Sequence, residues 1–146
     1  MTFLESLKTC LVDKYATFSG RASRSEFWWF VLFCILVGVV LDMLFPIDLP
    51  VNYNGVSEDL NVAPRNYLVA QLIGNLFLFI PYLSVGIRRL HDVGRSAWWQ
   101  LISLTGIGVI LLIYWSCKKG TPGPNRFGED PLQQDNNAPI TAQISE

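Results

Sequence analysis

The chain has few of the side chains from which catalytic and metal sites are built. It has a single histidine, His91, and its three cysteines are scattered without a Cys-x-x-Cys pair or a Cys/His spacing typical of metal sites. Only 16% of its residues are charged, and a net charge of −1 lacks the basic excess typical of nucleic-acid binding. We therefore expect no enzyme active site, no cofactor or metal ion, and no nucleic-acid partner.

Charge is almost absent from three long apolar runs. Residues 27–45 contain one charged residue, Asp42, whereas residues 67–87 and 97–117 contain none. At about 1.5 Å of rise per residue, each run as a helix is long enough to cross the roughly 30 Å hydrocarbon core of a bilayer. The sequence predicts an all-α integral membrane protein with three transmembrane helices over these runs. The polar residues 132–146 are predicted to form a flexible, disordered tail.

Two helix starts can be read from capping boxes. Thr2 with Glu5 begins a segment, residues 2–18, that has apolar side chains at helical spacing, so we expect an N-terminal amphipathic surface helix. Such a helix can anchor in the membrane interface or pack on the transmembrane helices, and the sequence favours neither. Ser23 with Glu26 predicts the start of the first transmembrane helix.

The Lys and Arg residues lie mainly at the ends of the runs, which bears on orientation. With three spans and a cytoplasmic N-terminus, seven Lys and Arg residues face the cytoplasm and four face outside. The reverse orientation exchanges these numbers, so we expect a cytoplasmic N-terminus. A third run that turned back at residues 105–108 would raise the ratio to ten against one. Its two limbs would be very short, however, and three full spans are the preferred prediction.

Three blocks of sequence carry a family resemblance. Residues 14–30 read KYATFSGRASRSEFWWF, residues 88–99 read RRLHDVGRSAWW, and residues 120–131 read GTPGPNRFGEDP. In this order and spacing they resemble the bacterial inner-membrane family catalogued as domain of unknown function 805. The resemblance covers residues 1–131, which we take as a single membrane domain. It implies a multi-pass protein of the bacterial inner membrane and implies no activity, and no role for the long polar loop 46–66 follows from it.

Arginines beside the first and third runs are the best candidates for a binding site. Because arginine binds phosphate groups through paired hydrogen bonds, the hypothesis is a cytoplasmic pocket for the headgroup of an anionic lipid. The alternative is that these residues set the topology and anchor the helix ends without a specific ligand. The candidates are Arg21, Arg24, Arg88, Arg89 and Arg95.

The pair His91-Asp92 is a second polar feature. Histidine titrates near neutral pH, which suggests acid–base chemistry. Side chains of adjacent residues diverge on a helix, however, and no nucleophile or metal-ligand set stands beside them. An equally simple interpretation is that Asp92 caps a turn and neutralises Arg88 or Arg95.

Polar residues also occur inside the predicted spans. In antiparallel helices, Asp42 and Gln71 lie at similar depth, and Asn75 shares a face with Gln71. We expect an interhelical hydrogen bond there, with a proton or ion step as the alternative. In the second span, Pro81 removes the donor for the carbonyl of residue 77 and is predicted to kink the helix.

These features favour a small, non-enzymatic inner-membrane protein that binds anionic lipids or a membrane-protein partner. The alternative is a subunit of a small-solute or ion transporter. Three spans are few for a transporter, so that alternative requires a homo-oligomer or a second membrane protein.

Overall fold

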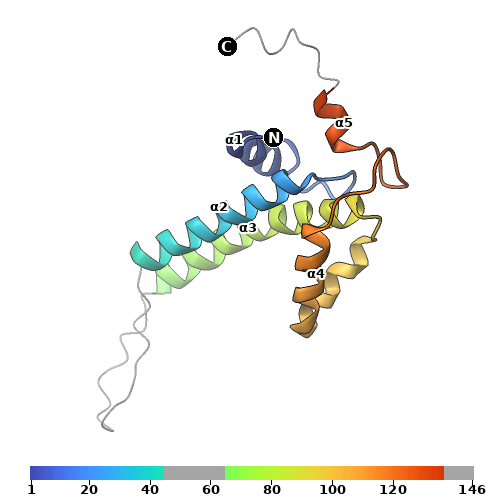
Figure 1. The fold of residues 1–146 in the computed structure, drawn as a ribbon. Coiled ribbons are helices and arrows are strands. Elements are labelled where there is room, and N and C mark those ends of the chain that lie inside the picture. Colours follow the sequence, from blue (N-terminus) through green and yellow to red (C-terminus); the bar gives the residue numbers. More distant parts are fainter. Residues whose placement is uncertain (45–64, 137–146) are drawn as a thin grey trace, which may run out of the picture.

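The computed structural model describes residues 1–44 and 65–136, and every regular element in these two ranges is helical (Figure 1). The all-α class predicted from the sequence is confirmed for this part of the chain. The loop 46–66, apart from its last two residues, and the tail beyond residue 136 lie outside the described residues. The elements in chain order are α1 (Phe3–Lys8), the π-helical η1 (Thr9–Asp13), α2 (Arg24–Leu44), α3 (Arg65–Asp92), the 3-10 helix η2 (Ala97–Thr105), α4 (Ile107–Cys117) and α5 (Pro131–Asn136).

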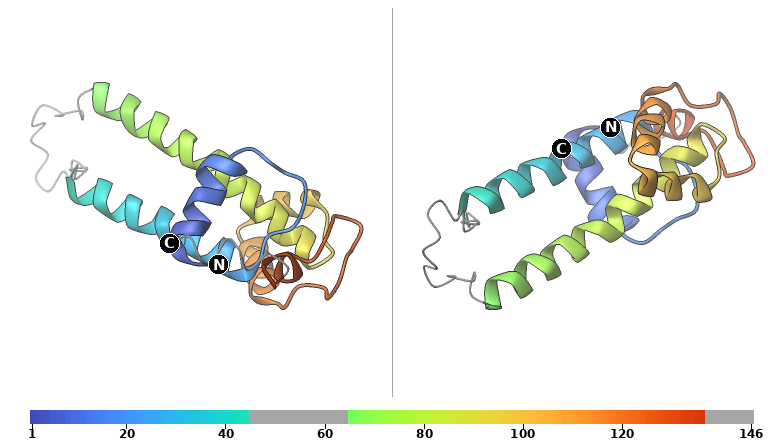
Figure 2. Two further views of the ribbon diagram at one scale, coloured as in Figure 1. Left: turned by 90° about the horizontal axis from the view of Figure 1, so that it is seen from above. Right: turned by 90° about the horizontal axis from the view of Figure 1, so that it is seen from below.

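The helices α2 and α3 form a long pair that lies close together at the Arg24 and Asp92 end and diverges toward the other end (Figure 2). They correspond to the predicted spans 27–45 and 67–87, and α3 continues through Pro81 as one helix. In the described part of the chain, one helix is long and apolar enough to cross a membrane by length and composition. It is α2, whose Arg24–Leu41 segment has a mean hydropathy of 1.8.

The third apolar run does not form one helix. Residues 97–105 form η2, residues 107–117 form α4, and the chain reverses between them at Gly106. The φ of Gly106 is 68°, a left-handed conformation that glycine adopts at little cost. Figure 1 shows the two segments folded against each other beside the α2/α3 pair. The prediction of one continuous helix over 97–117 is therefore wrong, and the alternative of a turn at residues 105–108 gives the observed shape.

The tip of this helical hairpin satisfies its own polar groups. The Thr105 hydroxyl donates to the carbonyl of Ile102 at 2.8 Å and accepts from the backbone N–H of Gly108 at 3.1 Å. A Cβ at Gly108 would overlap the Ile102 carbonyl, so the two limbs approach too closely for any other residue. Leu104 and Ile107, on either side of the turn, are 84% and 81% exposed.

The N-terminal helix ends earlier than predicted. The sequence predicts a helix over 2–18, but α1 and η1 end at Asp13. Its capping box is confirmed, with both reciprocal hydrogen bonds present. The helix lies across the α2/α3 pair (Figure 2) and packs through a face of small side chains, because Ser6 and Cys10 are fully buried. Ser6 Oγ also donates to the carbonyl of Glu26 at 2.7 Å, which fixes α1 on α2.

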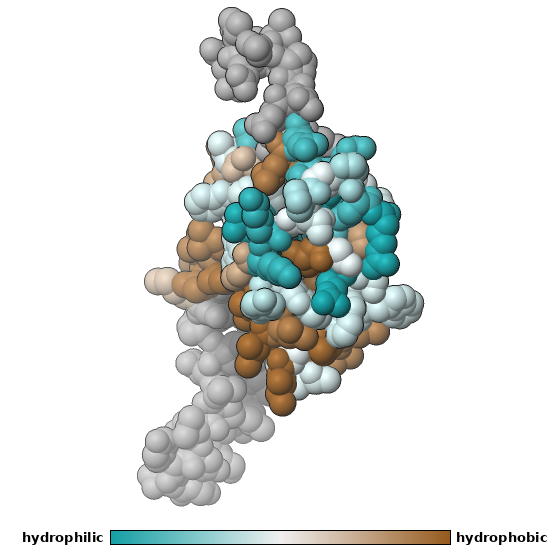
Figure 3. Space-filling view, turned by 45° about the vertical axis from the view of Figure 1, so that its right-hand side comes forward, coloured by the Kyte–Doolittle hydropathy of each residue, from teal (hydrophilic) through white to brown (hydrophobic). Residues whose placement is uncertain are grey.

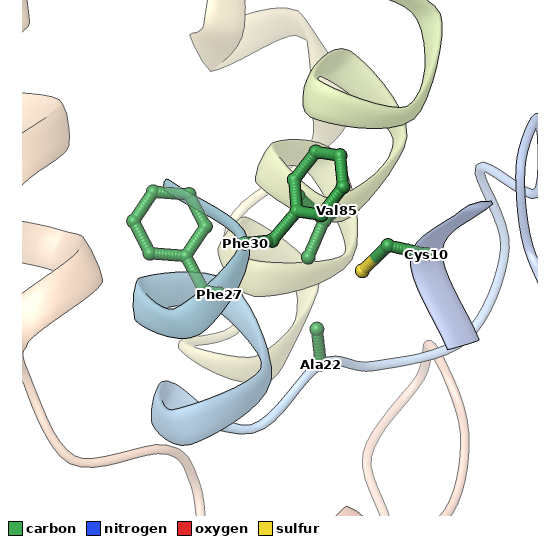
Figure 4. Packing of buried hydrophobic residues seen from close by; sticks show 5 residues of the cluster. All are labelled: Cys10, Ala22, Phe27, Phe30 and Val85. Carbon is green, nitrogen blue, oxygen red and sulfur yellow. The ribbon is translucent and has the colours of Figure 1, made fainter. Parts of the chain in front are cut away.

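The hydrophobic core is small and lies where η1, the start of α2 and α3 meet (Figure 4). Outside it, large apolar side chains along α2, α3 and the hairpin are exposed. In Figure 3, hydrophilic residues gather on one part of the surface and apolar residues lie beside and below them. The outer parts of the long helices therefore need an apolar environment that the protein itself does not supply. The core consists of Cys10, Ala22, Phe27, Phe30 and Val85.

A different correction concerns the C-terminal tail. The sequence predicts disorder over 132–146, but residues 131–136 form α5. Asp130 starts this helix, since its carboxylate accepts from the backbone N–H of Leu132 at 3.0 Å.

Candidate functional site

Three of the five candidate arginines lie in the interior, at the end of α3 where the three motif blocks meet. Arg21, Arg88 and Arg89 are 5%, 0% and 1% exposed. A buried guanidinium group needs acceptors for its N–H groups and a nearby negative charge. Two carboxylates, Glu26 and Asp92, and the backbone carbonyls of the C-terminal segment supply both.

Asp92 lies between Arg21 and Arg89 and pairs with both. The Arg21 Nε and Nη2 atoms lie 2.9 and 2.8 Å from its Oδ1 oxygen, and Arg89 Nη1 donates to Oδ2. The predicted partners of Asp92, Arg88 or Arg95, were therefore wrong. Burial lowers the pKa of Arg89, and the Asp92 carboxylate opposes that shift. One buried carboxylate thus holds two cations, one of them 71 residues earlier in the chain and the other three residues earlier.

Apart from a hydrogen bond of 3.3 Å from Arg89 Nη1 to the carbonyl of Ala22, the other hydrogen bonds of these two arginines go to α4 and the segment after it. Arg21 Nη1 donates to the carbonyl of Gly123 at 2.6 Å, and Nη2 donates to that of Thr121 at 2.5 Å. Arg89 Nε donates to the carbonyl of Ser116 at 3.1 Å. The chain after α4 is therefore held against the first two sequence blocks, residues 14–30 and 88–99, by charge-assisted hydrogen bonds. Such bonds are stronger than those between neutral groups.

The third sequence block, residues 120–131, also packs directly on the second block, residues 88–99. Gly120 passes so close to the Asp92 carboxylate that a Cβ at this position would overlap it. The backbone N–H and the hydroxyl of Thr121 both donate to the Asp92 carbonyl, at 2.9 and 3.0 Å. Gly-Thr at residues 120–121 is thus the sequence that lets the C-terminal segment close over the end of α3.

Arg88 and Glu26 form a second buried ion pair, from α3 to α2. Only half of the predicted capping box at Ser23 forms: Ser23 Oγ accepts from the N–H of Glu26 at 3.2 Å, but the Glu26 carboxylate bonds to Arg88 Nη1. The Cys10 thiol lies beside this pair, 3.9 Å from Arg88 Nη2. Burial, together with the Glu26 carboxylate, raises the pKa of Cys10 to about 12, so the thiol is protonated and unreactive.

His91 faces away from Asp92. Its ring stacks on Phe127, with 4.0 Å between centroids, and its Nδ1 atom lies 3.1 Å from the carbonyl of Gly20. Asn125 Nδ2 donates to the His91 carbonyl at 3.1 Å. Burial lowers the pKa of His91, so the ring is neutral at physiological pH. The two neighbours bind different partners, and His91 serves to fasten the C-terminal segment.

The other two candidate arginines are exposed. The guanidinium carbon of Arg95 lies 4.9 Å from the ring centroid of Trp115 and 5.7 Å from that of Trp99, a cation–π arrangement. Arg24 makes no hydrogen bond or ion pair with any residue in the described ranges. The sequence could not separate these two from the buried three, because all five flank apolar runs in the same way.

A pocket of about 860 Å³ opens between the start of α2 and the C-terminal segment. The exposed cations Arg24 and Lys119 line it, together with buried Arg89, while Trp28 and Leu32 give it an apolar side. Sequence reasoning missed Lys119, because a continuous third span would have put it on the other side of the membrane. The Thr-Gly-Ile-Gly sequence at residues 105–108 was the signal that could have found it.

The polar residues of the long helices are not brought into this site. Asn75 is exposed on α3 and has no partner among the described residues. The side chains of Asp42 and Gln71 lie outside the described residues, and so does their predicted hydrogen bond. Within the described ranges, no group of three or more His, Cys, Asp or Glu side chains could hold a metal ion.

Comparison with known proteins addresses the same three blocks. The family model for proteins of unknown function DUF805 matches residues 15–129. The chain belongs to the DUF805 family. Inner membrane protein YhaH of Escherichia coli K12 is 37% identical over 122 residues, which are 83% of this chain and 92% of YhaH. Inner membrane protein YhaI of the same strain is 35% identical over 122 residues, 83% of this chain and 91% of YhaI. No solved structure matches the chain.

In this DUF805 protein, the matched region contains the three buried arginines and their two carboxylate partners, which are Arg21, Arg88, Arg89, Glu26 and Asp92. The family motifs are thus the parts of the chain that bind one another: the first supplies Arg21 and Glu26, the second Arg88, Arg89 and Asp92, and the third supplies carbonyl acceptors.

Proposed function

We propose that this DUF805 protein is a non-enzymatic protein of the bacterial inner membrane that binds the headgroup of an anionic lipid on the cytoplasmic side. The observation that carries the proposal is the pair Arg24 and Lys119, two exposed cations on the wall of the 860 Å³ pocket. The relatives YhaH and YhaI are inner membrane proteins by name, which supports the location.

The chemistry of the pocket suits a phospholipid. Arginine offers a planar pair of donors to phosphate oxygens, and lysine adds a mobile point charge. Trp28 and Trp29 lie beside these cations, and indole rings favour the boundary between headgroups and acyl chains. Arg21 and Arg89 contribute indirectly, because their hydrogen bonds to Asp92 and to backbone carbonyls hold the pocket walls together. Arg88 pairs with Glu26 and does not line the pocket, and its Nε atom has no hydrogen-bond partner among the described residues.

The proposed topology has two full crossings, α2 and α3, with the η2–α4 hairpin entering and leaving on the cytoplasmic side. The hydrogen bonds from Arg21 to Thr121 and Gly123 support it, because they join the N-terminal and C-terminal motifs on one side. Ten of the eleven Lys and Arg residues then face the cytoplasm, and only Arg65 faces outside.

Lipid binding is tested with Arg24→Gln plus Lys119→Gln in the full chain, purified in mild detergent and examined by native mass spectrometry. The matched control is Arg95→Gln plus Lys118→Gln, which removes the same charge at exposed positions outside the pocket. We expect the pocket variant to lose bound anionic phospholipid and the control to retain it. Equal lipid retention in the two proteins would overturn the proposal.

The topology is tested separately with Glu129→Cys in a Cys117→Ser background. Glu129 is exposed in the third motif, so its replacement reports the side of that motif without disturbing the cluster. We expect an impermeant thiol reagent to label this cysteine only after lysis. Labelling in intact cells, with the outer membrane made permeable, would contradict the two-span topology.

A further inference from the structure

A second cavity lies beneath the helical hairpin. It has a volume of about 460 Å³, is open on one side, and is lined by four elements, which contribute Val31 from α2, Leu83 from α3, the exposed Leu104 from η2 and Leu112 from α4 among others. The volume is within the range of small-molecule sites, and the lining is predominantly apolar, as such sites are.

The two cavities share one residue. Trp28 lines both the headgroup pocket and the apolar cavity, so the two lie on either side of one residue. A phospholipid has the same arrangement, with a charged phosphate on one side of its glycerol and apolar chains on the other. We infer that the apolar cavity takes up one acyl chain of the lipid whose headgroup lies at Arg24 and Lys119. This inference rests on the proposed function.

The position of the helical hairpin explains how an acyl chain can enter the apolar cavity. Because η2 and α4 reverse at Gly106, the hairpin stands beside the α2/α3 pair and leaves the apolar cavity between them. Gly86 of α3 lines the cavity without a side chain, facing the amide of Gln100. The Gln100 amide has no hydrogen bond to the described residues, so it is free to donate to the ester carbonyl at the head of the chain.

The test uses phosphatidylglycerol with a photoreactive diazirine in the middle of one acyl chain, added to the full-length protein in nanodiscs. Cross-linked peptides are then mapped by mass spectrometry. Val109 and Ile110 give a matched pair of variants: they are neighbours on α4, but Val109 lines the cavity at 41% exposure, whereas Ile110 is 71% exposed and does not line it. The substitution Val109→Trp fills the cavity, and Ile110→Trp adds the same bulk outside it.

We expect cross-links on the cavity walls around Leu83 and Leu112, reduced severalfold by Val109→Trp and unchanged by Ile110→Trp. Leu83→Trp, on the opposite wall, replaces Val109→Trp if the latter fails to give a monodisperse protein. Labelling that is spread over the outer surfaces of the helices, and that neither Val109→Trp nor Leu83→Trp reduces, would overturn the acyl-chain site.

A neutral lipid separates the two proposals. The same diazirine chain on phosphatidylcholine is compared with phosphatidylglycerol. If both lipids label the cavity walls equally and Val109→Trp reduces both, the acyl-chain site stands and the anionic headgroup site fails. If phosphatidylglycerol is preferred but its chain does not label the walls, the headgroup site stands and the acyl-chain site fails.

Discussion

The hydroxyl of Tyr15 donates to the carbonyl oxygen of Phe77 at 2.7 Å, and this carbonyl is the one that Pro81 leaves without a helical donor. The two rings also pack together, with 5.3 Å between centroids. Near the proline on its other side, Ser84 Oγ donates to the carbonyl of Thr17 at 2.7 Å. The segment after η1 is therefore joined to α3 on both sides of Pro81, and it supplies the hydrogen bond that proline cannot make.

The substitution Tyr15→Phe removes this hydrogen bond and keeps the ring packing. We expect the free energy of unfolding to fall by about 1 kcal/mol, the typical net value of one intramolecular hydrogen bond. Equilibrium unfolding in detergent micelles measures it. Tyr114→Phe is the control, because Tyr114 is exposed and donates no hydrogen bond within the described ranges. Equal stability of the two variants would show that the Tyr15 bond contributes nothing.

Asp92→Asn removes the charge between Arg21 and Arg89. Two buried guanidinium groups then lose their shared carboxylate, and we expect a loss of about 3–5 kcal/mol, as for other broken buried ion pairs. The C-terminal segment, which both arginines hold, should become sensitive to limited proteolysis. The exposed Glu129 gives the control Glu129→Gln, expected to change stability by no more than about 0.5 kcal/mol. A protease-resistant Asp92→Asn protein would contradict this account.

The hairpin turn is tested by adding one methyl group. Gly108→Ala forces a Cβ into the carbonyl of Ile102, and we expect a loss of about 1–3 kcal/mol, as for other overpacked sites. Gly74→Ala is the control: no atom lies within 4 Å of its added Cβ, so stability should hold or rise slightly. Thermal unfolding monitored by tryptophan fluorescence compares the two. If Gly108→Ala unfolds at the same temperature as Gly74→Ala, the close approach of the limbs is wrong.

The stability of the protein should depend on the protonation of His91. Burial lowers the pKa of this side chain below its ordinary value of 6.5, so as the pH falls the unfolded chain binds a proton before the folded one does. The contribution of His91 to the free energy of unfolding therefore has its full value above pH 6.5. It decreases as the pH falls from there toward the folded-state pKa. Unfolding curves on both sides of pH 6.5 measure this slope.

The control for this prediction is His91→Gln, which cannot titrate in that range. His91 is the only histidine in the chain, so the variant should lose the dependence on pH just below 6.5. An unchanged slope in His91→Gln would assign the dependence to carboxylates instead.

The long helices were predictable because hydropathy and length suffice for them. The prediction failed for residues 97–117, where hydropathy is uniformly high and the deciding feature is backbone geometry. Gly106 adopts a positive φ, and Gly108 lacks the Cβ that would keep the limbs apart. Neither property changes the hydropathy of the run, so a turn and a span look alike to any method that averages over side chains.

The burial of Arg21, Arg88 and Arg89 could not be predicted for a different reason. All five candidate arginines flank apolar runs, but Arg21 and Arg89 have most of their acceptors on segments far away in the sequence. Asp92 was paired with its near neighbours in sequence, whereas one of its two partners comes from a motif 71 residues earlier. Burial of a charge depends on such distant partners, and a single sequence shows only which charges are present.

The separation between Arg21 and its acceptors also sets the order in which the protein can assemble during synthesis. The carbonyl of Gly123 is 102 residues further along the chain than Arg21. Ribosomes add roughly 5–20 residues per second, so about 5–20 s pass between the two. Because α3 ends at Asp92, Arg21 has neither the Asp92 carboxylate nor its C-terminal acceptors for most of that interval. A chain that stops before residue 121 lacks the carbonyls of Thr121 and Gly123, and its Arg21 keeps only the pair with Asp92.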